Sequence, residues 1–309
     1  MKRNKIKVIG TAFVGAVALA ALASCGNSSD ASIKAYTRDT TSGTRDGFFT
    51  GIGFEDAKAD NTVLVKDYIE VASNGDMISS VKGDENAIGY ISLSSLEESG
   101  VKGLTYEGVT PNETNVLNGT YKLTRNFNYC KRASYTNEKE GQIVDAFIAY
   151  LSTTEGKATI KEHGGILETS SSDVSWQTLK ESYTIDDEDN SKLTIEVGGS
   201  TSVKSIVSNL LTEFSAKCGN FLIKYNPTGS GDAYKRTNGS EKDGANACDL
   251  AFASREFKDS EAMDSSLKGK MCVDAIVAVV NNKNSIDSIT KDQLKNIYNG
   301  TTTKWADLK

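Results

Sequence analysis

The residues best suited to chemistry lie close together near the start of the chain, in the segment 37–45. Arg38 offers a planar, permanently charged fork of donors that matches the oxygens of a tetrahedral anion such as phosphate. Ser42 and Thr44 stand where a helix would begin, so their hydroxyls would lie beside its unpaired backbone amides. The segment indicates either a grip for an oxyanion or an ordinary capped helix next to a surface arginine. It pairs no nucleophile with a base.

A strand and a short helix would position this segment. Residues 33–37 alternate between apolar and polar side chains, as a half-buried strand does, and they deliver Arg38 at the carboxyl end of that strand. Phe48 and Phe49 then continue an apolar face beyond Thr44. The strand, the hydroxyl-rich turn and the helix together make one α/β unit.

Three further predicted strands also end in hydroxyl or arginine side chains. Ligands bind outside the carboxyl ends of strands in open α/β sheets, so four such ends predict one shared anion site. The turn near Val203 is similar to a phosphate-binding P-loop, but that motif needs glycine at this position, and nucleotide hydrolysis is not predicted. The strands and the residues that follow them are 193–197 with Thr201 and Ser202, 221–225 with Ser230, and 249–253 with Ser254 and Arg255.

The rest of the chain also alternates between strand and helix patterns, which places the fold in the α/β class. Residues 87–93 and 273–280 are nearly continuous apolar runs, as strands covered on both faces are. The acidic, polar segment 181–192 is the predicted linker. Helices are predicted from apolar spacing over 143–151, 156–162, 203–214 and 291–298.

Residues 1–24 form a predicted lipoprotein signal peptide, in which four cations precede an apolar run too short to span a bilayer. The small residues directly before Cys25 resemble a bacterial lipobox. Cleavage there, with lipid on the Cys25 thiol, would anchor the chain to the outer side of a membrane. The polar residues 25–31 would be the tether. A plain secretory signal cleaved near Ser24 is the alternative.

The charge balance limits the classes of partner. The chain has 35 Lys and Arg against 41 Asp and Glu; without the four cations of the signal peptide, 31 remain and the net charge is near −10. An acidic chain with no basic run argues against nucleic acid as the partner. Any bound anion must therefore be held by local donors and not by the field of the whole protein.

The cysteines and the histidine do not predict a metal site. The one histidine, His163, stands at a predicted helix end, and the cysteines form no CxxC pair. The cysteines beyond Cys25 could form two disulfides in three pairings or remain buried thiols. No metal or other cofactor is expected. These cysteines are Cys130, Cys218, Cys248 and Cys272.

Taken as a set, these motifs resemble the phosphate-binding proteins that serve the high-affinity phosphate ABC transporters of bacteria. The second half of the chain looks like the opening segment of that family, and the first half looks like its closing segment. The matching pieces of the second half are 199–203, 228–231, 253–256, 276–281 and 289–305; those of the first half are 38–45, 87–90 and 119–121.

The order of the halves is therefore reversed relative to the family. Joining Lys309 to Ser32 would restore the family order, so the sequence is interpreted as a circular permutation with the acidic segment 181–192 as the new joint. Permutation is tolerated where the old termini lie close together and the new break falls in an exposed loop. A fragment of a tandem or truncated gene is the competing explanation.

The resemblance implies a two-lobe α/β fold of the periplasmic-binding-protein type (type II), with the ligand cleft between the lobes. It implies one lobe of residues 31–87 plus 285–309 and another of residues 88–284, the latter including the joint 181–192. The site residues that it implies are Arg38, Ser42, Gly43 (through its amide) and Thr44 from one lobe, and Thr201, Ser202, Ser230, Ser254 and Arg255 from the other.

Two positions depart from the family pattern. Thr41 stands where the family usually has glycine, and Arg255 stands where some members carry an aspartate that accepts the proton of bound phosphate. Such an acceptor distinguishes phosphate from sulfate, which carries no proton. Asp39, Asp46 and Asp232 are the candidates for this acceptor.

The expected function is that of an extracytoplasmic, lipid-anchored and monomeric protein that binds inorganic phosphate and presents it to the permease subunits of an ABC transporter. Binding of another tetrahedral oxyanion, such as sulfate, molybdate or tungstate, is one alternative. An exported phosphatase or esterase with Ser42 or Thr201 as nucleophile is another. It is weakened by the position of His163, which has no evident acid partner.

Overall fold

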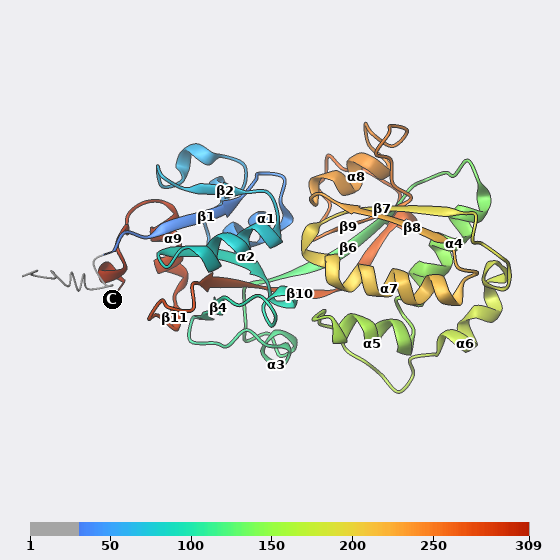
Figure 1. Cartoon of the computed structure of the whole chain (residues 1–309), viewed down its shortest axis with the longest axis horizontal. Helices are drawn as coiled ribbons and strands as arrows, with labels where there is room; N and C mark the ends of the chain where they lie inside the picture. The colour runs from blue at the N-terminus through green and yellow to red at the C-terminus, as the bar shows by residue number, and fades with distance from the viewer. Residues whose placement is uncertain (1–30, 309) are drawn as a thin grey trace, which may run out of the picture.

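The computed structural model describes residues 31–308 and shows two α/β lobes joined by two long strands (Figure 1). The predicted signal peptide and Cys25 lie outside the described residues. One sheet runs through both lobes in the order β2-β1-β3-β10-β6-β9-β7-β8, with β4 paired to β10. The fold class predicted from the sequence is thus confirmed.

The first lobe is built around three parallel strands, because β1 pairs with both β2 and β3. Its core stacks Phe48 on Tyr90 with ring centroids 4.0 Å apart, and Tyr298 meets Phe48 edge-on. The elements of this lobe are β1 (Lys34–Arg38), α1 (Gly43–Gly51), β2 (Ile69–Val71), α2 (Asn74–Gly83), β3 (Ala87–Ser92), β4 (Lys102–Gly103), β5 (Thr105–Tyr106), α3 (Glu113–Leu117), β11 (Ser288–Ile289) and α9 (Lys291–Tyr298).

The second lobe repeats this plan, with β7 pairing in parallel with β8 and β9. Helix α7 buries the apolar stripe that the sequence predicts, which includes Ile206, Leu210 and Phe214. The elements of this lobe are α4 (Glu138–Tyr150), α5 (Thr154–Glu162), α6 (Trp176–Leu179), β7 (Thr194–Gly199), α7 (Lys204–Lys217), β8 (Leu222–Pro227), α8 (Gly231–Thr237) and β9 (Leu250–Ala253).

Strands β6 (Thr124–Lys131) and β10 (Lys268–Val280) connect the lobes (Figure 1). The first part of β10 pairs with β6, and its last residues, 276–280, pair with β3. Each lobe therefore shares β10, and a relative movement of the lobes must bend these two strands.

The hydrophobic cores do not place the boundary between the lobes at residues 87 and 88, where the sequence predicted it. Ile88, Tyr90, Leu104 and Tyr121 pack in the core that contains Phe48, so residues 88–123 lie with the first lobe. The reason is that β3 is a central strand between β1 and β10 and cannot leave the sheet of the first lobe. The two changes of lobe fall instead near residue 124 on β6 and residue 275 on β10.

The two ends of the described chain lie against each other. The amide of Ile33 donates to the carbonyl of Thr303 at 2.8 Å, and that of Trp305 donates to Ala31 at 3.1 Å. The predicted joint 181–192 forms two short 3-10 turns, Lys180–Ser182 and Thr184–Asp187, between the last helix of one half and β7. This is the arrangement that a circular permutation requires, although the permutation itself stays a prediction.

Two features of the described residues concern disulfide bonds and membrane-spanning helices. Cys130, Cys218, Cys248 and Cys272 are all buried, and none of the four is in a disulfide. Within residues 31–308, no helix is both long and apolar enough to cross a bilayer.

Candidate functional site

Helix α1 begins as the sequence predicts, and a local turn fixes its start. Ser42 adopts an extended conformation and its Oγ accepts the amide of Arg45 at 3.4 Å, which makes it the N-cap. Just before it, the Asp39 carboxylate accepts the amide of Thr41 at 2.9 Å and the Thr41 hydroxyl at 2.5 Å. The turn is therefore held before any ligand enters, with the first amides of α1 directed toward the second lobe.

Five hydroxyls from the two lobes meet at this helix start, and we call them the hydroxyl cluster: Thr44, Ser200, Ser202, Ser230 and Ser254. The Oγ1 atom of Thr44 lies 2.8 Å from the Oγ of Ser202 in the other lobe. Ser254 Oγ lies 3.0 Å from both Ser200 Oγ and Ser230 Oγ. Each of the five side chains is at most 2% exposed. Because a hydroxyl can rotate and act as donor or acceptor, all five can turn to the oxygens of one small anion.

Two glycines permit the close contacts around the cluster, Gly43 between the lobes and Gly199 within the second lobe. A Cβ at Gly43 would lie 2.6 Å from the hydroxyl oxygens of both Ser230 and Ser254, so only glycine fits between α1 and the second lobe. Gly199, which ends β7, has φ +97°, and a Cβ there would lie 2.0 Å from the carbonyl oxygen of Phe252. The cluster thus depends on backbone positions that a side chain would block.

Arg38 lies at the end of β1 and is 2% exposed. Its Nε donates to the carbonyl of Val71 at 3.2 Å and its Nη2 donates to that of Ala72 at 2.9 Å. Burial lowers the pKa of Arg38, and nearby Tyr90 and Asp39 oppose that shift. Within the described residues, Nη1 makes no hydrogen bond, so this end of the fork is available to an anion.

The two predicted site residues of the 200–202 turn, Thr201 and Ser202, make different contacts. Ser202 joins the hydroxyl cluster, whereas the Thr201 hydroxyl accepts the amide of Asn74, at the start of α2, at 3.4 Å. Ser200 belongs to the predicted hydroxyl turn but was not among the predicted site residues, yet its Oγ caps the turn by accepting the amide of Ser202 at 3.2 Å and also contacts Ser254. Its position as an N-cap serine after a strand was the signal that could have found it.

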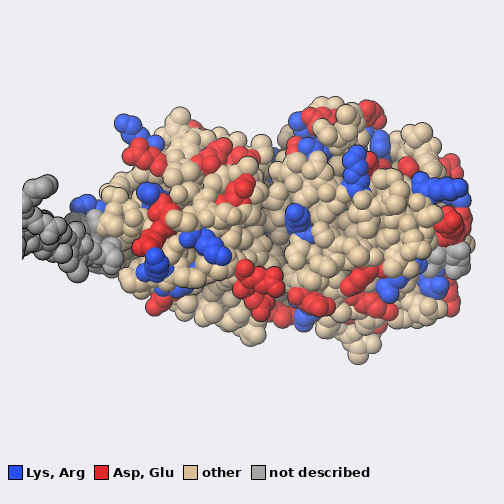
Figure 2. Space-filling model, in the orientation of Figure 1, with Lys and Arg blue, Asp and Glu red and all other residues tan. Residues whose placement is uncertain are grey.

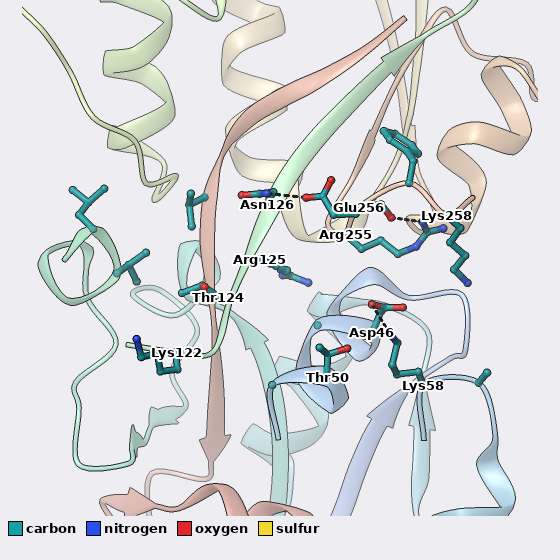
Figure 3. A pocket seen from close by; sticks show the side chains of 17 residues that line it. Asp46, Thr50, Lys58, Lys122, Thr124, Arg125, Asn126, Arg255, Glu256 and Lys258 are labelled. Carbon is teal, nitrogen blue, oxygen red and sulfur yellow. Dashed lines mark hydrogen bonds and ion pairs between the residues drawn. The ribbon is translucent and has the colours of Figure 1, made fainter. Parts of the chain in front are cut away.

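Arg255 is not brought to the hydroxyl cluster. Its Nη1 and Nη2 each lie 2.7 Å from an oxygen of Glu261, a bidentate pair within the second lobe. The guanidinium of Arg255 instead borders a separate groove between the lobes, whose volume is about 950 Å³. Figure 3 shows this groove, with Arg255 and Glu256 on one side and Asp46 and Thr50 of α1 on the other.

The three predicted proton acceptors are occupied elsewhere. Asp39 holds the turn before α1, and Asp46 lies 3.6 Å from the Nζ of Lys58. Asp232 accepts the hydroxyl of Thr228 and lies 3.3 Å from Arg236. None of the three contacts a member of the hydroxyl cluster among the described residues.

A buried ion pair in the connecting strands was not predicted. Arg125 of β6 and Asp274 of β10 are cross-strand partners, with Nε 2.9 Å from Oδ2. Asp274 is fully buried and its Oδ1 accepts the hydroxyl of Ser92 at 2.6 Å. Burial raises the pKa of the Asp274 carboxyl, while Arg125 and Ser92 act in the opposite direction. A single charge inside the apolar run 273–280 was the sequence signal.

The described residues hold no group of histidine, cysteine and carboxylate side chains that could bind a metal ion. His163 ends α5, as predicted, and its Nδ1 lies 3.4 Å from the side-chain amide of Asn209. In residues 31–308, no hydrogen bond joins His163 to Ser42 or Thr201. The arrangement offers neutral dipoles and one arginine, and within the described residues it lacks the nucleophile–base contact that hydrolysis needs.

Two lobes, parallel strands that end in donor turns, and donors from both lobes facing one gap define a solute-binding protein of the two-lobe class. Residues 180–309 match the model of the PBP superfamily domain. The chain is 31% identical over 300 residues to the phosphate-binding protein PstS 2 of Streptococcus pneumoniae serotype 4, covering 93% of this chain and 94% of the relative.

A second relative, the phosphate-binding protein PstS 2 of Streptococcus agalactiae serotype V, is 28% identical over 316 residues, covering 100% of this chain and 99% of the relative. The crystal structure of the phosphate-binding protein of a phosphate ABC transporter from Streptococcus pneumoniae TIGR4 superposes with a TM-score of 0.63 and 27% identity, covering 90% of this chain and 100% of that one. The chain belongs to this family of phosphate-binding proteins, whose members are binding proteins and not enzymes.

Proposed function

We propose that this protein binds inorganic phosphate between its lobes and delivers it to the permease of an ABC transporter. The observation that carries the proposal is the hydroxyl cluster, in which Thr44 of one lobe and Ser202 of the other lie 2.8 Å apart beside the start of α1. An anion held there would be gripped by both lobes at once. The relatives named as phosphate-binding proteins support phosphate as that anion.

Local donors can hold the anion in an acidic protein. Hydrogen bonds to a charged group contribute about 1.5–3 kcal/mol each, so several that converge in a dry gap give tight binding. Lys, Arg, Asp and Glu are interspersed over the face shown in Figure 2, without a large basic patch. Arg38 and the amides of α1 therefore supply the attraction at short range, as the charge balance of the sequence requires.

Closure of the lobes would complete the site. Strands β6 and β10 are the connections on which the lobes can bend, and hinge closure around a ligand is common in two-lobe binding proteins. Open lobes would separate Thr44 from Ser202 and admit the anion. The closed form would then be the form that the permease recognises.

The predicted signal peptide and lipid attachment at Cys25 support an extracytoplasmic place for this function. A lipid on Cys25, followed by the tether 25–31, would hold the lobes near a permease in the same membrane. Mass spectrometry of the membrane fraction, with Cys25→Ser as comparison, tests the anchor.

Isothermal titration calorimetry with phosphate, sulfate, molybdate and tungstate at two pH values tests the proposal. We expect phosphate to bind most tightly, and Arg38→Ala to abolish its binding because a buried, charged donor is lost. Thr201→Ala should weaken binding less, since its hydroxyl lies toward α2. Unchanged phosphate affinity in Arg38→Ala would refute the site assignment.

The engaged carboxylates Asp39, Asp46 and Asp232 favour one alternative ligand class. Among the described residues none of these three carboxylates hydrogen-bonds the hydroxyl cluster, although Asp39 lies 3.8 Å from Arg38, so a fully ionised oxyanion such as sulfate, molybdate or tungstate meets little repulsion at the cluster. The same titrations decide between these anions and phosphate. Turnover of a chromogenic phosphate ester, measured in parallel, tests the hydrolase hypothesis, and we expect none.

A further inference from the structure

The Asp39 carboxylate lies between the turn that it holds and the arginine of the proposed site. Its Oδ1 accepts both the amide and the hydroxyl of Thr41, at 2.9 and 2.5 Å. Its Oδ2 lies 3.8 Å from Nη2 of Arg38, which is beyond hydrogen-bond distance. No other carboxylate of the described residues lies as close to Arg38. The two bonds from Thr41 therefore hold this carboxylate short of a direct bond to the arginine.

Arg38 has one edge of its guanidinium left for an anion. Its Nε donates to Val71 and its Nη2 donates one proton to Ala72, while Nη1 makes no hydrogen bond within residues 31–308. The free edge consists of Nη1 and the second proton of Nη2. Such an edge binds a carboxylate and a phosphate in the same way, with two N–H donors to two oxygens. The Asp39 carboxylate and a bound phosphate would therefore compete for it.

The side chain of Thr41 also contacts the second lobe. A Cβ at Gly231, the first residue of α8, would lie 2.8 Å from the Cβ of Thr41 and 3.4 Å from its Oγ1. A Cβ at Gly229 would lie 3.8 Å from the same hydroxyl oxygen. The β-branched side chain of Thr41 has few rotamers, and this contact with the start of α8 restricts them further. Its hydroxyl is thus kept on Asp39 while the lobes are in contact.

We propose that Thr41 is a positioning residue of the anion site, whose hydroxyl holds the Asp39 carboxylate away from the free edge of Arg38 and so keeps that edge for the ligand. Without the hydroxyl, the carboxylate would turn to the guanidinium, because such a charge-assisted pair is stronger than a bond to one amide. Phosphate would then have to displace a like charge from Arg38. The inference rests on the proposed function and does not require Thr41 to touch the ligand.

A double-mutant cycle between Thr41 and Asp39 tests the inference, with phosphate dissociation constants measured by calorimetry on the full chain at neutral pH. Thr41→Val keeps the shape of the side chain and removes its hydroxyl, and we expect binding about fivefold to tenfold weaker. In an Asp39→Asn background, the same substitution should change the affinity less than about twofold, because a neutral amide attracts the guanidinium far less than a carboxylate does. A purely structural role of Thr41 would give the same loss in both backgrounds.

Three further variants separate the hydroxyl from the packing. Thr41→Ala removes the same hydroxyl without a branched side chain and should behave as Thr41→Val does. Thr41→Ser keeps the hydroxyl and should bind phosphate within about twofold of the wild type. Thr40→Val is the matched control and should bind normally, because Thr40 is exposed in the same turn and its hydroxyl makes no hydrogen bond to any described residue.

Two results would overturn the inference. One is an unchanged phosphate affinity in folded Thr41→Val and Thr41→Ala, and the other is an equal loss with and without Asp39→Asn. Failure of the wild type to bind phosphate would instead count against the proposed function.

Discussion

The hydroxyl oxygens of Thr44 and Ser202 lie 2.8 Å apart, although 158 residues separate them in the chain. Thr44 lies in the first turn of α1 in one lobe, and Ser202 lies in the 3-10 turn before α7 in the other. Both are buried, and because the contact joins the two lobes, separation of the lobes would break it. It links the position of the lobes directly to the donors of the proposed phosphate site.

Thr44→Val should weaken phosphate binding and leave the fold nearly unchanged. The substitution keeps the shape of the side chain but removes one donor to the anion, worth about 1.5–3 kcal/mol for a charged acceptor, or about 10- to 100-fold in affinity. Calorimetry measures the loss. Thr212→Val is the control, because its hydroxyl bonds the carbonyl of Ser208 on the surface of α7. Equal affinities for the two variants would argue against a role of Thr44 in the site.

Gly43→Ala should impair closure and not folding. The new Cβ would lie 2.6 Å from the hydroxyl oxygens of Ser230 and Ser254, which belong to the other lobe, so the clash arises only when the lobes meet. We expect an unchanged melting temperature without phosphate and an affinity lowered by about tenfold or more. Gly83→Ala, at a position with no atom within 4 Å of the new Cβ, is the matched control. A lower melting temperature with a normal phosphate affinity would contradict this prediction, because it would mean that the added methyl group strains one lobe and not the closure.

Arg45→Met should destabilise the protein much more than it affects the ligand. Arg45 is fully buried, and its guanidinium donates to the carbonyls of Ala57 at 2.9 and 2.6 Å and of Arg38 at 2.7 Å. Removing it leaves buried acceptors unpaired, at a cost of about 1–3 kcal/mol or more in the free energy of unfolding. Urea denaturation measures this loss. The remaining folded protein should still bind phosphate, in contrast to Arg38→Ala.

This contrast shows what the sequence alone could and could not reveal. Local patterns predicted the apolar stripe of α7 and the start of α9, where Thr290 and Gln293 form a capping box. They also placed Arg38 and Ser42 at a strand end. They assigned no role to Arg45, because only the fold shows that its guanidinium is buried against the carbonyls of Ala57 and Arg38.

The missed site residues depend on contacts between distant parts of the chain. Asp274 meets Arg125 and Ser92 across 149 and 182 residues, and no local period encodes such a pairing. Ser254 was predicted from its motif, but its contacts with Ser200 and Ser230 follow from the fold, in which β9 and β7 are neighbours in the sheet. The strand order therefore decided which hydroxyls meet, while the sequence indicated only that each follows a strand.

Stability should decrease as the pH rises above 9, because folded thiols resist ionisation. Burial raises the pKa of Cys130 from 9.0 to about 12 and that of Cys248 from 9.0 to about 11. The pKa of each thiol is therefore higher in the folded protein than in the unfolded chain. The stabilisation from these protonated thiols is complete below pH 9 and is lost as the pH rises toward the folded-state values. Each thiol lowers the free energy of unfolding by about 1.4 kcal/mol per pH unit in that window.

Urea unfolding between pH 7 and 10 measures this slope. The comparison with Cys130→Ala isolates the thiol, because the tyrosines whose pKa burial raises from 10.0 contribute to the slope of both proteins. Cys130→Ala should be less stable at pH 7 but should show a shallower decline above pH 9. A decline as steep as that of the wild type would mean that Cys130 ionises as easily in the folded protein as in the unfolded chain.

Reversing the predicted permutation should leave the fold and the binding intact. Ile33 and Thr303 are joined by a backbone hydrogen bond of 2.8 Å, so a short glycine-serine linker from Leu308 to Ile33 would span a small gap. New ends between Ser191 and Lys192, both exposed, would open the joint, with residues 1–30 kept as the leader before Lys192. We expect cooperative unfolding and a phosphate affinity within about threefold of the original chain, because no core contact or donor changes.

A control variant with the same linker but with its new ends between Ala275 and Ile276 would cut β10, which both lobes share, and should not fold. If the first variant fails to fold, the joint 181–192 contributes more than a connection, and the permutation hypothesis loses its structural support.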